Sequence, residues 1–84
     1  MQVMHYGSVI DYESSTAPYR QVAAILRERI ISGKYRPGQR LPSINDLVGE
    51  FGVARTTAGK ALRLLVDEGV AELSQGMGFY VRGI

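Results

Sequence analysis

The sequence lacks the residues that several classes of function require. It contains no cysteine, which excludes disulfides, thiolate zinc sites and thiol nucleophiles and is compatible with a reducing compartment. Its one histidine, His5, has no metal-ligating residues around it in the sequence, and no pair of carboxylates stands in a recognisable catalytic pattern. We therefore expect no enzyme, no metal site and no cofactor.

Long apolar stretches are also missing. A membrane-spanning helix needs about 18 consecutive apolar residues, and no such run occurs. The N-terminus lacks the basic start and the continuous apolar segment of a secretory signal. We expect a soluble cytoplasmic protein with no membrane partner.

The length of the chain limits its organisation. Its 84 residues, 45% of them apolar, are enough for one compact core and too few for a second domain. We expect any sensor or oligomerisation domain to lie in another chain or to be absent, and no site for a small-molecule effector is evident. Ten Lys and Arg against eight Asp and Glu give a net charge of +2, which points only weakly to an anionic partner.

Residues 1–16 are interpreted as an N-terminal arm. The segment is polar at 13–16, and the alternation of Val9, Ile10 and Tyr12 allows one short strand. Residues 17–84 are expected to form the folded domain. Apolar residues at helical spacing, with Pro or Ser at a start and Gly beyond an end, predict three helices in this domain. They run from Pro18 to just before Gly33, from the cap Ser43 to just before Gly52, and from about Arg55 to Asp67.

The third predicted helix has two different faces. Apolar residues at offsets of three and four predict a buried stripe made of Ala58, Ala61, Leu62, Leu65 and Val66. The opposite face presents three cations together with two small residues, namely Arg55, Thr56, Gly59, Lys60 and Arg63. This asymmetry is the strongest indication of function in the sequence.

A β-hairpin is predicted after the third helix. Residues 70–73 and 79–81 can form two strands around a turn at 75–78. Three helices followed by a hairpin, with a short Gly-containing turn between the second and third helices, make a winged helix-turn-helix. We therefore expect a mainly α fold with a small β-hairpin as its wing.

From about Ile10 to Val81, these residues resemble the DNA-binding domain of GntR-family transcriptional regulators. The matching segments are 19–23, 30–43, 51–57, 61–62, 65–69 and 75–81. The resemblance implies sequence-specific binding of double-stranded DNA, usually as a dimer on a palindromic operator, with an effector-binding domain attached C-terminally. On this basis we expect a transcriptional regulator that acts as a repressor and reads an operator with its third helix and wing.

The resemblance also implies which residues reach DNA. Arg55 lies in the first turn of the third helix, where a recognition helix meets base edges, and its planar fork suits the N7 and O6 acceptors of guanine. Ser43 begins a helix whose dipole favours a phosphate, and Gln75 and Gly76 match wing positions that approach the minor groove. The predicted DNA-binding residues are Ser43, Asn45, Arg55, Thr56, Thr57, Lys60, Gln75 and Gly76. For Arg63 we expect a surface ion pair with Asp67.

Three positions depart from the family pattern. Ala54 replaces a capping Ser or Thr worth about 0.5–2 kcal/mol. Gly59 and Asn45 stand where basic residues are common, although Gly59 could instead let the backbone approach DNA closely. These departures predict weak affinity for DNA. They also leave a second hypothesis open, in which the domain is a winged-helix adaptor for protein interactions with little DNA affinity.

The oligomeric state stays open at this stage. Operator half-sites about one helical turn apart need two copies of a reading domain. Apolar residues in the arm suggest a homodimer formed through this segment; they are Val3, Met4, Tyr6, Val9 and Ile10. The alternative is a monomer that dimerises only on its operator.

Overall fold

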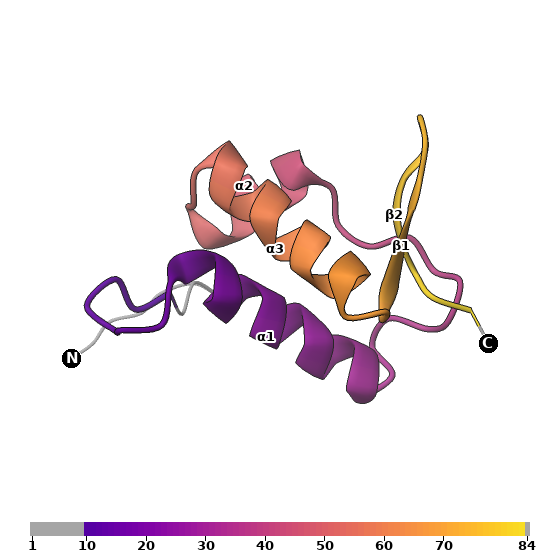
Figure 1. Cartoon of the computed structure of the whole chain (residues 1–84), viewed down its shortest axis with the longest axis horizontal. Helices are drawn as coiled ribbons and strands as arrows, with labels where there is room; N and C mark the ends of the chain where they lie inside the picture. Colours follow the sequence, from indigo (N-terminus) through magenta and orange to yellow (C-terminus); the bar gives the residue numbers. More distant parts are fainter. Residues whose placement is uncertain (1–9, 84) are drawn as a thin grey trace.

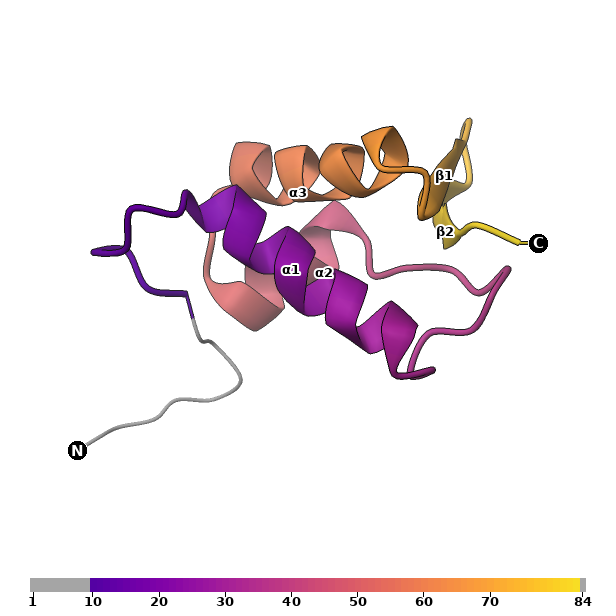
Figure 2. The same cartoon turned by 60° about the horizontal axis from the view of Figure 1, so that its bottom comes forward.

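The computed structural model describes residues 10–83. In this range the chain forms helices α1 (Pro18–Ile31), α2 (Ile44–Phe51) and α3 (Arg55–Asp67), followed by strands β1 (Ala71–Ser74) and β2 (Gly78–Val81). Helix α3 packs against α1, α2 and β1, and the hairpin stands across the C-terminal end of α3 (Figure 1). Figure 2 shows α3 running along one side of the other two helices. This is the winged helix-turn-helix that the sequence predicts.

The helix ends follow from local residue chemistry. Pro18 is the first residue of α1, where its missing N–H costs nothing, and Gly33 beyond the helix has a φ of 87°. Helix α2 ends at Gly52, whose φ of 68° favours glycine. Ala54 precedes α3 without a side-chain cap, so the predicted loss of this cap is confirmed.

The hairpin is extended by the linker that precedes α2. Strands β1 and β2 pair antiparallel, with Ala71 opposite Val81 and Ser74 opposite Gly78, so the first strand begins one residue later than predicted. The Leu41 N–H donates to the Phe79 carbonyl at 2.8 Å, and Arg40 forms an isolated bridge with Tyr80. The linker therefore ties the wing to the start of α2.

One apolar core lies between the three helices and the hairpin. The four fully buried residues of α3 come from the predicted stripe, whereas Val66 is only partly buried. The buried core residues in the described part of the chain are Val22, Ala23, Leu26, Leu41, Leu47, Phe51, Val53, Ala58, Ala61, Leu62, Leu65, Ala71 and Val81. Burial of this face leaves the opposite face of α3 free to meet a partner.

The described end of the arm packs on its own domain. Residues 10–16 form turns and bends with no strand among them, and Ile10 packs against the core. The Gln21 side chain holds this segment, donating to the Asp11 and Thr16 carbonyls at 2.8 Å each. The other arm residues proposed to form a dimer lie outside the described residues. No helix within residues 10–83 is long and apolar enough to span a membrane.

Within residues 10–83, two ion pairs join α1 to α2 and to the residue that follows α3. Arg27 donates to both carboxylate oxygens of Glu68, just beyond α3, at 2.7 and 2.9 Å. Arg29 pairs with Glu50 of α2 at 2.5 Å and lies over the Phe51 ring. Hydrogen bonds from Arg29 to Glu50 raise the pKa of the guanidinium above its usual value. Since these side chains are only 19% and 34% exposed, the second pair is partly shielded from water.

We predict that Arg29→Met destabilises the domain, because Glu50 then stays partly buried without its cation. The expected loss in the free energy of unfolding is about 1–3 kcal/mol, measured by urea denaturation. Arg36→Met is the matched control, since Arg36 is exposed and its side chain makes no hydrogen bond or ion pair within the described residues. Equal stability of the two variants would contradict the prediction.

Candidate nucleic-acid interface

Three segments reach the same side of the molecule. The N-terminal ends of α2 and α3 and the turn of the hairpin all stand along the upper edge in Figure 1. Contacts connect them: Asn45 of α2 bonds to Arg55 of α3, and Arg40 in the linker lies against Gly78 of the wing. The predicted DNA-binding residues are distributed over these three segments.

The first turn of α3 presents Arg55 to solvent. Its Nη1 donates a hydrogen bond to Oδ1 of Asn45 in the first turn of α2. Both side chains are exposed, and this is the only side-chain partner of either within residues 10–83. Thr56 beside Arg55 is exposed as well, while Thr57 is partly buried.

Ser43 caps α2 in the predicted way. Its Oγ accepts a hydrogen bond from the Asp46 N–H at 3.0 Å, and the Asp46 carboxylate accepts one from the Ser43 N–H at 3.0 Å. Bonds from the Ser43 main chain and then its hydroxyl lower the pKa of Asp46. Because the folded-state pKa is lowered, this stabilisation is present above about pH 4 and is lost as the pH falls through the lowered value.

Lys60 lies over the ring of Tyr19, with its Nζ 5.1 Å from the ring centroid. This contact joins α3 to the start of α1 beside a shallow groove. The groove is lined by Ala17, Pro18, Tyr19, Thr56, Thr57, Gly59, Lys60 and Arg63. A Cβ on Gly59 would meet only Ile44 Cδ1 at 3.6 Å, an ordinary contact, so packing alone does not require glycine there.

The prediction of an ion pair between Arg63 and Asp67 is wrong. Within the described residues neither side chain makes an ion pair, although both are exposed on α3. An exposed pair gains little in water and must immobilise two long side chains, which explains why helical spacing alone did not produce it. Arg63 instead lines the groove beside Lys60.

The wing presents its turn to solvent. Gln75 and Gly76 are exposed, and Gly76 has a φ of 77°, which a glycine adopts without strain. Met77, also in the turn, is 58% exposed. No group of three potential metal ligands comes together anywhere in the described part of the chain.

Residues 18–81 match the family model for bacterial regulatory proteins of the gntR family. The chain belongs to the GntR family. It is 47% identical over 64 residues to the mannosyl-D-glycerate transport/metabolism system repressor MngR of Escherichia coli (strain K12), covering 76% of this chain and 27% of that protein. Over 69 residues it is 45% identical to the histidine utilization repressor of Klebsiella aerogenes, covering 81% of this chain and 29% of that repressor. This GntR-family chain thus spans less than a third of these curated relatives.

Solved structures show the same fold. YtrA from Sulfolobus acidocaldarius, a GntR-family transcription factor, has a TM-score of 0.82 and 38% identity, covering 93% of this chain and 82% of that one. The AraR DNA-binding domain in complex with operator ORX1 has a TM-score of 0.76 and 32% identity, covering 92% of this chain and 99% of that one. Both likenesses confirm the predicted winged helix-turn-helix and the predicted family.

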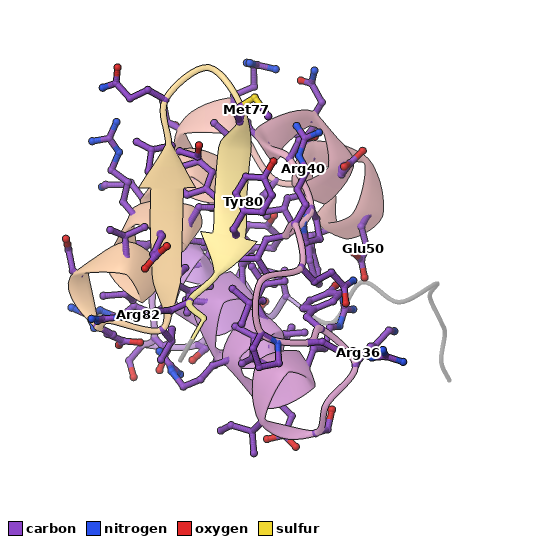
Figure 3. The ribbon with its side chains drawn as sticks, turned by 90° about the vertical axis from the view of Figure 1, so that its right-hand side faces the viewer. Arg36, Arg40, Glu50, Met77, Tyr80 and Arg82 are labelled. Carbon is purple, nitrogen blue, oxygen red and sulfur yellow. The ribbon has the colours of Figure 1, made fainter. Side chains whose placement is uncertain are left out.

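Arg40, which lies beside the second strand of the wing close to its turn, was not predicted from the sequence. Figure 3 shows Arg40 beside Tyr80, on the same side of the hairpin as Met77. A Cβ added to Gly78 would lie 3.1 Å from both Nε and Nη2 of Arg40, so the guanidinium occupies the space that a side chain would need. Gly78 also has a φ of 116°. No periodicity marks Arg40, because its role depends on pairing with a strand 40 residues further along the chain.

We predict that Gly78→Ala destabilises the domain and distorts the wing, because alanine must adopt a left-handed φ and displace Arg40. The expected cost is about 1–3 kcal/mol in the free energy of unfolding. Gly83→Ala is the control, since a Cβ at Gly83 has open space and the residue has no positive φ. Chemical denaturation of both variants checks this, and a Gly78→Ala protein as stable as the control would refute it.

Proposed function

We propose that this GntR-family chain reads a specific operator in double-stranded DNA and represses transcription by occupying it. The observation that supports this most is the exposed cationic face of α3, a helix whose first turn reaches the same edge of the molecule as the α2 N-terminus and the turn of the wing. A neighbour of the same fold is described in complex with its operator. The curated relatives are named as repressors, which favours DNA binding over the adaptor hypothesis.

In this proposal α3 enters the major groove with its first turn. Arg55 meets the N7 and O6 acceptors of a guanine, and Thr56 and Thr57 contact a phosphate or a thymine methyl. Lys60, steadied by its contact with Tyr19, neutralises a phosphate further along the helix. The capped start of α2 at Ser43 receives another phosphate, because a helix N-terminus attracts anions.

The wing contacts the neighbouring minor groove. Gly76 has no side chain, so the main chain of the turn can approach the DNA backbone, and Gln75 can donate to an acceptor there. Arg40 braces the strand that leads out of this turn and adds a positive charge between the wing and α2. These contacts fix the register of α3 on the duplex rather than choosing the base sequence.

Two copies are needed to read a palindromic operator, and we propose that this chain binds as a dimer. A contact through the arm remains our hypothesis for residues 1–9. Ile10 already packs on its own core, so any such contact would have to come from the residues before it. The chromosome is the target, so we place the protein in the cytoplasm.

Selection from a library of randomised duplexes at about 0.15 M salt tests the function. The wild-type chain is expected to enrich one sequence. Arg55→Ala is expected to bind that sequence about 10- to 100-fold more weakly and to lose the preference for one guanine, because a bidentate contact is worth about 1–3 kcal/mol. Arg36→Ala, which removes an exposed arginine from the linker, is the matched control. Enrichment of no sequence by the wild-type chain would contradict the proposal.

A further inference from the structure

The hydrogen bond between Asn45 and Arg55 joins two residues of the predicted interface to each other. A guanidinium has only donors, so it must be the oxygen of the Asn45 amide that faces Arg55. The acceptor end of Asn45 is therefore occupied within the protein. This differs from the simplest expectation for the pair, in which each side chain contacts DNA on its own.

Restraint of the Arg55 side chain lowers the conformational entropy that it loses when it binds a base. A long exposed side chain loses rotamer freedom worth up to about 2 kcal/mol when it is fixed against a partner. Arg55 is exposed and begins its helix, so no core packing restrains its side chain. A contact from α2 that restrains the guanidinium before DNA arrives reduces this loss on binding.

The hydrogen bond to Asn45 leaves one edge of the Arg55 guanidinium, formed by Nε and Nη2, available to contact a base. It uses one hydrogen of Nη1, whereas Nε and Nη2 make no hydrogen bond or ion pair within the described residues. These two atoms form a parallel pair of donors that suits the N7 and O6 acceptors of guanine. The restrained guanidinium thus keeps the edge that bidentate recognition requires.

Charge also favours a neutral acceptor at position 45. Asn45 is the second residue of α2, where the exposed N–H groups of the helix carry partial positive charge. A cation there would face both this charge and the Arg55 guanidinium. An amide oxygen attracts Arg55 without adding a negative charge that would repel phosphates.

We propose that Asn45 is a positioning residue that orients Arg55 toward a guanine, and that it acts on DNA recognition only through Arg55. The proposal rests on the proposed function and deepens it, since it assigns the choice of one base pair to a pair of residues from α2 and α3. If the two side chains contacted DNA independently, the effect of Asn45→Ala on affinity would not depend on the presence of Arg55. This dependence can be measured.

The test is a double-mutant cycle on the duplex that the wild-type chain selects from the randomised library. Affinities are measured for the wild type, Asn45→Ala, Arg55→Ala and the double variant. We expect Asn45→Ala to weaken binding about two- to tenfold in the wild-type background and to have no effect when Arg55 is already alanine. We also expect Asn45→Ala and Arg55→Ala to relax the preference at the same guanine.

Two further variants complete the test. Asn45→Asp keeps an acceptor oxygen and is expected to retain the preference for that guanine, although its charge weakens overall binding. Ser32→Ala, a neutral polar residue replaced at the far end of α1, is the matched control and should leave affinity unchanged. Thermal unfolding of each variant checks that these exposed substitutions leave the fold intact.

The outcomes separate this inference from the proposed function. Equal effects of Asn45→Ala in both backgrounds, or a relaxed preference at a different base pair, overturn the positioning role while DNA reading stands. No effect of Asn45→Ala, or tighter binding, overturns it as well. A wild-type chain that selects no duplex overturns the proposed function and this inference together.

Discussion

Burial of one face of α3 is the constraint on which the rest of the structure depends. Its four buried residues, Ala58, Ala61, Leu62 and Leu65, are in contact with the core that α1, α2 and β1 complete. Two of the four are alanines, whose small side chains let neighbouring elements approach closely. Because one face is committed to the core, Arg55 and its neighbours can only point outward. The core therefore also determines which side chains α3 presents at its surface.

A second level of organisation fixes where the other contacts stand relative to α3. The linker before α2 pairs with β2, so the capped start of α2 and the wing form one connected unit. Within this unit Arg40 lies against Gly78 of the wing, and the pair of Arg29 with Glu50 joins the unit to α1. A reading helix without such support would bind DNA in many orientations, whereas phosphate contacts on both sides define its register.

The sequence was informative where a local rule decides the structure. Pro18, Ser43 and Gly52 mark helix ends through their own backbone chemistry, and the spacing of apolar residues revealed the buried face of α3. Prediction from the sequence failed where a side chain contacts a residue that is distant along the chain. Arg27 meets Glu68 across 41 positions, and no pattern in the sequence links them. The pair expected between Arg63 and Asp67 rested on spacing alone and does not form, and the bond from Arg55 to Asn45 depends on how two helices pack.

We propose that three separate segments of this chain meet one duplex, and a single titration can test whether they do. This proposal is tested most directly by nuclear magnetic resonance of the isotope-labelled chain during titration with the duplex that the chain selects. The account predicts that the largest changes in backbone amide shift fall in residues 43–46, 54–60 and 75–78, with little change around the end of α1 at residues 28–34. Largest changes at the end of α1, with residues 54–60 unaffected, would contradict it.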